Sequence, residues 1–300
     1  MAMLVRLAAL VVMVSSDAAP PLTDVGCGTS ARLSTVPARP RRGAMFVVRV
    51  ADAAPGSELS GRVAGQALHF SRDAAGRLVS LAPAPIDSAS LAVVVVCLTD
   101  VTQDTIQLRL ALAQGHYAVE QLRVAPQFSA PPDSAVMARQ QRESDRAADV
   151  ARLAHETPRL WSRPFSPPRA SRVTSRFGGG REFNGTVTSR HMGTDFAGAV
   201  GAPIRSANRG VVRLVDEFYL GGKVVYVDHG AGVVTAYLHM SAQRVAPGDT
   251  VERGTVLGLV GATGRVTGPH LHFIVRYGAV SVDPQSLLDS ALGARYVPVQ

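Results

Sequence analysis

Short apolar runs separated by turn residues fill the first half of the chain. Residues 44–50 and 91–98 are almost continuously apolar, as strands buried on both faces are. Residues 106–110 and 117–122 alternate between apolar and polar side chains, which is typical of half-buried strands. Glycine and proline punctuate these runs near residues 55 and 115. The pattern predicts a small β-sandwich over residues 27–127.

The pattern changes after Pro131 and Pro132. Residues 134–156 contain neither glycine nor proline and predict a helix, with Asp133 or Ser134 as its N-cap. Its apolar positions are sparse, so we expect a thinly anchored connector. Four prolines between residues 158 and 168 then predict a stiff, extended stretch, docked through Trp161 and Phe165. Residues 131–168 are therefore interpreted as a linker between two domains.

The remaining residues again predict β-structure. Apolar runs at 223–227 and 233–238 flank a glycine-rich turn at 228–232, which indicates a hairpin. His229 falls in that turn, where we expect a structural role. We predict a second domain over residues 169–290, followed by a C-terminal tail at 291–300, and a mainly β fold for the whole chain.

Candidate chemistry gathers in three short clusters of this second domain. His270 and His272 are two apart on a predicted strand and therefore point to the same face. His191 and Asp195 form a second cluster, and His239 stands between the two. A catalytic zinc takes three protein ligands and leaves one position to water. His191, Asp195 and one member of the pair would suffice, leaving two histidines to act on water or substrate. The alternative is a polar strand face that carries two histidines without a metal.

The order of these motifs resembles that of a known family. H-x-G-x-D at 191–195, Y-x-H at 237–239 and T-G-x-x-T-G-P-H-L-H-F at 263–273 are similar to the lysostaphin-type (LytM-domain) zinc endopeptidases. S-R-F-G at 175–178 and D-P at 283–284 extend the resemblance over about residues 173–288. The resemblance implies an antiparallel lysostaphin-like fold with a duplicated hybrid motif. It also implies an immunoglobulin-like module ahead of the peptidase domain.

The resemblance also assigns roles to the residues. It implies that one Zn²⁺ per chain is bound by His191, Asp195 and His272, with His239 and His270 as catalytic histidines. The implied substrate is a peptide bond in a stem peptide or cross-bridge of bacterial peptidoglycan. Which bond is cut is left open. The alternative is a catalytically inactive LytM-type domain that binds cell wall or activates an amidase, but such domains have usually lost metal ligands. Other hydrolase motifs, G-x-S-x-G and H-E-x-x-H, are absent from the sequence.

One departure from the family concerns the residue after the last aromatic. Many members have glutamate there, whereas this chain has Ile274. We expect Ile274 to lie on the strand face opposite Phe273 and to leave the metal unaffected.

The charge of the chain and its N-terminal residues indicate where the protein acts. The net charge of +8 would attract anionic polymers, but no nucleic-acid-binding motif is present, so we expect no nucleic-acid partner. Arg6 and the apolar run that follows predict a signal peptide at residues 1–18, with a buried strand as the alternative. No segment is apolar enough for a transmembrane helix. We therefore expect export to the periplasm, the cell envelope or the medium.

Two cysteines, Cys27 and Cys97, predict one disulfide in an exported chain. Lipid attachment at Cys27 is the weaker alternative, because Asp24 stands where a lipobox has an aliphatic residue. The role of the N-terminal module is left open between covering the cleft, binding a protein partner and acting as a spacer.

Overall fold

The computed structural model describes residues 31–53, 57–73, 75–98, 103–115, 117–123, 133–183 and 186–296. The predicted signal peptide and Cys27 lie outside these ranges. Cys97 is buried and disulfide-bonded, in agreement with the predicted bond. None of the helices within the described ranges is long and apolar enough to span a membrane.

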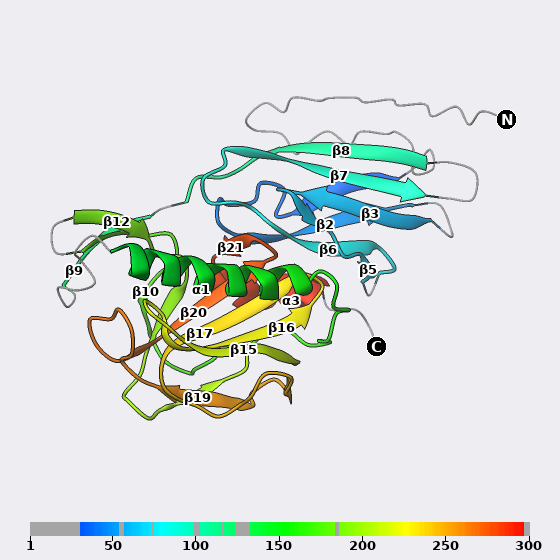
Figure 1. The fold of residues 1–300 in the computed structure, drawn as a ribbon. Coiled ribbons are helices and arrows are strands. Elements are labelled where there is room, and N and C mark those ends of the chain that lie inside the picture. The colour runs from blue at the N-terminus through cyan, green and yellow to red at the C-terminus, as the bar shows by residue number, and fades with distance from the viewer. Residues whose placement is uncertain are drawn as a thin grey trace.

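The N-terminal module consists of two four-stranded antiparallel sheets that share one core (Figure 1). This arrangement confirms the predicted β-sandwich. The first sheet has the order β1 (Arg32–Val36), β2 (Met45–Ala51), β6 (Leu78–Pro83), β5 (Ser71–Arg72). The second sheet has the order β4 (Gln66–Ala67), β3 (Glu58–Val63), β7 (Ser90–Leu98), β8 (Gln103–Ala111).

The strand expected at residues 117–122 does not join the sandwich. It forms β9 (Val119–Leu122), which pairs in parallel with β11 (Gly180–Phe183). β11 in turn pairs with β12 (Thr186–Arg190), giving a small sheet in the order β12-β11-β9. The chain therefore inserts a strand from the end of the N-terminal module beside the segment that leads into His191.

One large antiparallel sheet carries the C-terminal half of the chain and confirms the predicted β-structure. Its main path runs β10 (Val173–Ser175), β13 (Thr194–Ala197), β20 (His270–Tyr277), β17 (Val233–Gln243), β16 (Gly222–Gly230), β15 (Gly210–Phe218), β18 (Thr250–Val251). Attached to this path are β14 (Pro203–Arg205), β19 (Val256–Val260) and β21 (Val280–Val282). The predicted hairpin is β16–β17, and His229 is fully buried beside its turn. Its Nδ1–H donates to the Arg209 carbonyl oxygen at 2.7 Å and its Nε2 lies 2.8 Å from Thr235 Oγ1, so its role is structural as expected.

β20 presents different chemistry on its two faces because successive side chains alternate. Leu271, Phe273 and Val275 enter the central hydrophobic core. His270 and His272 lie on the opposite face, which places the predicted histidine pair together as the spacing required.

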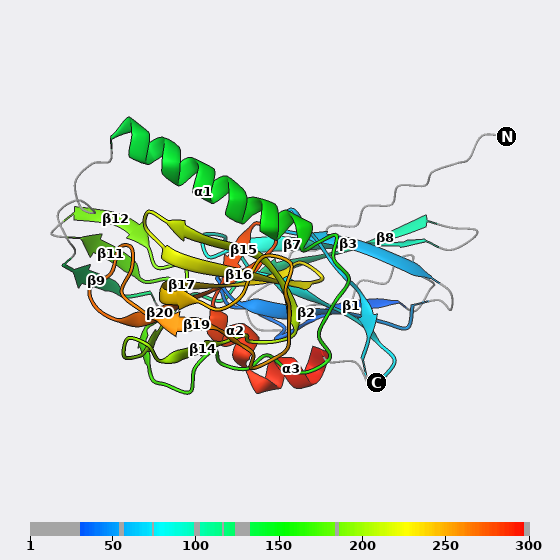
Figure 2. The same cartoon turned by 60° about the horizontal axis from the view of Figure 1, so that its bottom comes forward.

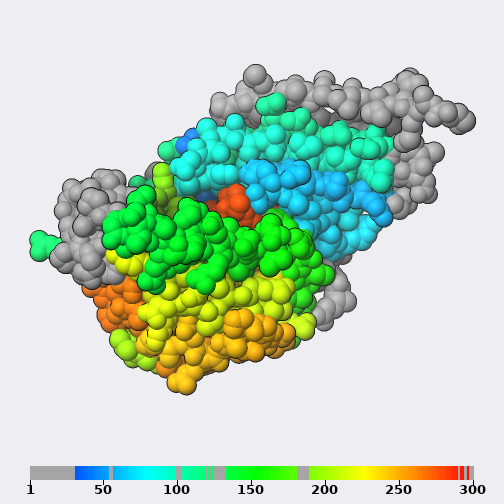
Figure 3. Space-filling model, viewed as in Figure 1, coloured from blue at the N-terminus to red at the C-terminus, as the bar shows by residue number. Residues whose placement is uncertain are grey.

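The linker helix is α1 (Ser134–Leu153), and the Asp133 carboxylate caps it by accepting the Val136 N–H at 2.8 Å. Ala147 and Val150 pack on the face of the large sheet that carries the histidines, against residues of β15–β17. The sequence predicted a thinly anchored helix because α1 has few large apolar residues. The small side chain of Ala147 lets the helix lie close to the sheet, so α1 is anchored more firmly than expected. Figure 2 shows α1 lying over β15 and β16, and Figure 3 shows the helix in green between the sandwich and the rest of the large sheet.

The central core joins the sandwich to the large sheet. On β2, Phe46 and Val48 face the sandwich core, whereas Met45 and Val47 face the central core that contains Phe273. β6 contributes Val79 and Leu81 to the same central core. The continuous apolar character of β2 thus reflects burial on both faces.

The predicted C-terminal tail is partly helical. After α2 (Pro284–Leu288), residues Ser290–Tyr296 form α3. Tyr296 is buried, with its ring centroid 5.0 Å from that of Trp161. The ring centroids of Trp161 and Phe165 are 4.9 Å apart. Both linker aromatics therefore dock as expected, and the end of the described chain completes the central core.

Candidate active site

His191 is held rigidly at the end of β12. Its backbone N–H donates to Gly179 O at 2.7 Å, and its carbonyl accepts the Gly178 N–H at 2.7 Å. The ring Nδ1 lies 2.9 Å from the Arg176 carbonyl oxygen, so Nδ1–H donates to that oxygen. The Ser175 hydroxyl is 3.0 Å from the same nitrogen. A neutral His191 therefore presents the lone pair of Nε2 to the site, as metal-binding histidines do.

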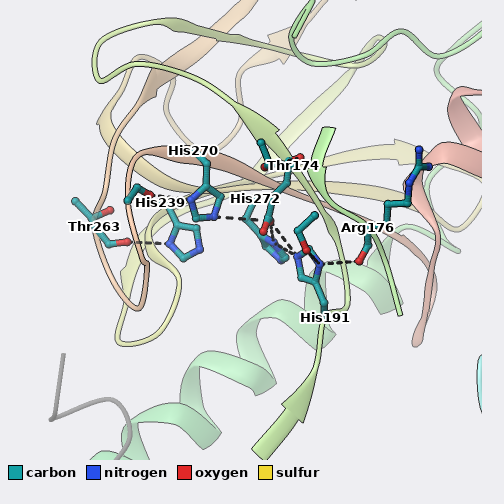
Figure 4. Close-up of polar contacts among 10 residues, drawn as sticks. Thr174, Arg176, His191, His239, Thr263, His270 and His272 are labelled. Carbon is teal, nitrogen blue, oxygen red and sulfur yellow. Dashed lines mark hydrogen bonds and ion pairs between the residues drawn. The ribbon is translucent and has the colours of Figure 1, made fainter. Parts of the chain in front are cut away.

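Asp195 and His272 meet across paired strands. Asp195 of β13 lies opposite His272 of β20 in the sheet register. Its Oδ1 is 2.6 Å from His272 Nδ1 and 3.0 Å from His191 Nε2, while the two histidine nitrogens are 2.9 Å apart (Figure 4). All three side chains are buried. The sequence-predicted ligand set thus converges on one point, with its donor atoms all within 4.8 Å of one another.

Gly193 explains the middle position of the H-x-G-x-D cluster. A Cβ at this residue would lie 2.6 Å from His272 Cε1 and 2.7 Å from the Phe273 carbonyl oxygen. No side chain fits in that gap without moving the ring or the backbone. Glycine therefore lets the His191–Asp195 segment approach β20 closely enough for its side chains to reach His272.

The charges of this cluster fit a bound cation. His191 Nε2 and Asp195 Oδ1 face each other at 3.0 Å. If the His191 ring is neutral with its proton on Nδ1, a lone pair on Nε2 faces a lone pair on the carboxylate oxygen. A proton or a metal ion between them removes that repulsion. Burial raises the pKa of the Asp195 carboxyl, but hydrogen bonds from His191 and His272 outweigh burial and hold this pKa well below its ordinary value. Two imidazole nitrogens and one carboxylate oxygen are a ligand set typical of catalytic zinc.

His239 and His270 flank the cluster on one side, with ring centroids 5.0 Å apart (Figure 4). The Nδ1–H of His239 donates to Thr263 O at 2.8 Å, and that of His270 donates to Gly268 O at 2.8 Å. Each ring therefore turns Nε2 away from its backbone partner, and His270 Nε2 lies 3.7 Å from Asp195 Oδ1. Both histidines lie beside the three converging donors and outside that set.

The environment of His239 is unusual in two ways. Its φ of 62° lies in the left-handed region that side chains other than glycine rarely adopt. Burial, followed by repulsion from His272 and His270, lowers its pKa to about 3. The ring is therefore neutral at physiological pH and offers a proton-accepting nitrogen.

Sequence reasoning did not find the partners that orient these rings. The carbonyls of Arg176, Thr263 and Gly268 each accept an Nδ1–H, and every residue type carries such a carbonyl. The S-R-F-G and T-G-x-x-T-G motifs identify the segments that carry these carbonyls, but they do not indicate that the carbonyls orient the histidine rings. Ile274 lies opposite Phe273 as expected. It packs against the apolar cluster formed by α1 and β15–β17, so a family-type glutamate would meet apolar side chains here.

Comparison with known proteins agrees with this geometry. Residues 189–284 match the model of Peptidase family M23. The chain is 36% identical over 124 residues to peptidoglycan DD-endopeptidase ShyC of Vibrio cholerae, and 40% identical over 109 residues to peptidoglycan DD-endopeptidase ShyA of that organism. These segments cover 41% and 36% of this chain but only 28% and 23% of the two relatives.

A solved structure, described as a putative peptidase M23 from Pseudomonas aeruginosa, shares more of the architecture. It aligns with a TM-score of 0.64 at 26% identity, covering 85% of this chain and 95% of that one. The fold and site define a metallopeptidase-type hydrolase domain. The chain carries an M23 peptidase domain, which confirms the lysostaphin-type resemblance.

Proposed function

We propose that this protein is a zinc-dependent endopeptidase that hydrolyses peptide bonds in bacterial peptidoglycan. The observation that carries the proposal is the convergence of His191, Asp195 and His272 beside two further histidines with oriented Nε2 atoms. In this assignment His191, Asp195 and His272 hold one zinc ion, and His239 and His270 are catalytic.

The chain supplies proton transfer and orientation. When bound, zinc lowers the pKa of a water molecule and polarises the scissile carbonyl. One of His239 and His270 accepts a proton through Nε2 as water attacks the carbonyl carbon. The protonated ring then donates to the developing oxyanion or to the amine that leaves as the C–N bond breaks. Thr263 O and Gly268 O hold both rings in the required tautomer throughout.

The substrate class comes from the relatives and from charge. Both Vibrio cholerae relatives are named peptidoglycan DD-endopeptidases, so cross-linked stem peptides are the first substrates to test. A net charge of +8 favours association with anionic cell-wall polymers. Such a substrate places the protein outside the cytoplasm, in the periplasm, the envelope or the medium, consistent with the predicted signal peptide.

The test compares three variants with the wild type in zinc content and in cleavage of purified peptidoglycan. His272→Ala should lose zinc and activity together, because it removes a ligand. His239→Ala and His270→Ala should keep zinc and lose roughly 10²–10⁴-fold in rate, as acid/base residues do. Zinc retained in His272→Ala but lost in His270→Ala would reverse the two roles. Wild-type protein that binds zinc and cell wall without cleaving it would favour the inactive, binding class of LytM-type domain.

A further inference from the structure

The buried face of α1 contains one charged side chain, Glu143, which is only 6% exposed. Both of its carboxylate oxygens lie 3.0 Å from Tyr219 N, and Oε1 also accepts the Arg139 Nε–H at 2.7 Å. A buried carboxylate is unfavourable unless hydrogen bonds replace its water. The Arg139 bond lies within α1, but the Tyr219 N–H belongs to the turn between β15 and β16, which indicates that this carboxylate fixes the turn to the helix.

That turn is also bonded to the active site. The Gly221 carbonyl accepts the backbone N–H of His239 at 2.9 Å. The Leu220 carbonyl accepts the backbone N–H of Arg265, also at 2.9 Å, and so holds the loop that precedes β20. The turn at residues 218–222 therefore connects α1 on one side with the His239 strand and the 263–265 loop on the other.

The 218–222 turn packs closely against the 263–265 loop. Gly222 has a φ of 59°, and a Cβ there would lie 2.2 Å from Thr263 Oγ1 and 2.4 Å from Thr263 O. Lys223 N–H donates to Thr263 Oγ1 at 3.0 Å. Thr263 O is the acceptor that orients His239. A shift of the turn must therefore displace the partner of the His239 ring.

His239 depends on such support because of its backbone. A left-handed conformation at a residue other than glycine persists only where the surroundings determine it. Here two hydrogen bonds do so, one from the backbone N–H to Gly221 O and one from the ring to Thr263 O. Both lead back to the turn that Glu143 holds.

We propose that Glu143 is a positioning residue for His239, acting through the 218–222 turn. The proposal rests on the catalytic role given to His239 under the proposed function. It assigns part of the active-site construction to α1, which lies outside residues 189–284 that match the family model.

The first test measures kcat and KM on soluble cross-linked muropeptides prepared from peptidoglycan. Glu143→Ala should lower kcat by roughly 10–100-fold, because misplacing a catalytic group by ~1 Å costs about 100-fold. KM should stay within about twofold, since ground-state binding is not altered. Glu143→Gln keeps a carbonyl oxygen for Tyr219 N–H and should recover most of the rate. Asp145→Ala is the matched control, because this α1 carboxylate is exposed and accepts a hydrogen bond from Gln141 of the same helix.

The second test does not depend on activity. Hydrogen–deuterium exchange at residues 218–222, at His239 and at Arg265 should accelerate in Glu143→Ala, but not in Glu143→Gln or Asp145→Ala, with zinc content unchanged. Wild-type kcat and unchanged local exchange in Glu143→Ala would overturn the proposal. So would zinc loss, failure to fold or faster exchange throughout the sheet, since these show a general structural role. If wild-type protein cleaves no muropeptide, the proposed function fails, while the exchange comparison still tests the link from α1 to His239.

Discussion

Acidification should destabilise the protein through a histidine pair that joins the sandwich to the end of α1. His69 Nε2 and His155 Nδ1 are 2.8 Å apart, with stacked rings whose centroids are 5.1 Å apart. His155 Nε2 is 3.3 Å from Gln66 Oε1, and its ring packs edge-on against Tyr277. One of the two close nitrogens must accept a hydrogen bond, so the contact requires a neutral ring. Charging both rings would place two cations in contact.

The magnitude follows from the pKa values. Burial, and then repulsion from His155, lowers the pKa of His69 from its ordinary 6.5 to about 4. Burial, and then the charge of Arg62, also lowers the pKa of His155. The unfolded chain gains protons below about pH 6.5 whereas the folded pair does not, so stability falls between pH 6.5 and 4 and is unaffected above that range. At 1.36 kcal/mol per pH unit His69 alone would account for roughly 3 kcal/mol. Partial exposure of the ring reduces this to roughly 1–2 kcal/mol.

The assay is denaturant unfolding of wild type, His69→Gln and Arg72→Gln at pH 7 and pH 4.5. The free energy of unfolding of His69→Gln should fall less on acidification than that of wild type, by about 1 kcal/mol. Arg72→Gln alters an exposed side chain on nearby β5 and should behave as wild type. Other groups, including buried His229, contribute equally to all three proteins and cancel in the difference. An equal fall in wild type and His69→Gln would refute the reasoning.

Three further predictions concern packing. Gly193→Ala should weaken zinc binding by roughly 10–100-fold, measured by chelator competition, because its Cβ would displace His272; unchanged affinity would contradict the close approach. Leu81→Ala should cost about 2–5 kcal/mol of stability in thermal or denaturant unfolding, and a single unfolding transition should remain. A fragment of residues 161–300 should aggregate or bind a hydrophobic dye, whereas a soluble, zinc-binding fragment would show that the C-terminal half folds alone.

The candidate metal site is the part of the structure that the sequence predicts best. Strand periodicity alone places His270 and His272 on one face, and the H-x-G-x-D spacing supplies an imidazole and a carboxylate. The structure brings His191, Asp195 and His272 together as the resemblance implied. Their roles in binding and catalysis remain predictions for the zinc and activity measurements.

Features set by packing between distant segments were not predictable in the same way. The apolar run of β2 indicated a strand, but not that its two faces belong to two different cores. The sequence does not indicate how closely α1 packs on the sheet. Its buried positions are largely alanine and include Glu143, and glutamate is a residue type that usually faces solvent. The expected tail carries Tyr296, whose burial depends on contact with Trp161.

The sheet that contains β2 and β6 restricts how the N-terminal module can move. Met45, Val47, Val79 and Leu81 are each at most 2% exposed in the central core. Exposing four such side chains costs roughly 6–12 kcal/mol at 1.5–3 kcal/mol each, which is comparable to the stability of a whole domain. A hinge that swings the module away would need a partner able to supply that free energy. The module therefore stays fixed on the face of the sheet opposite the histidines, and any substrate must reach the five site residues with that module in place.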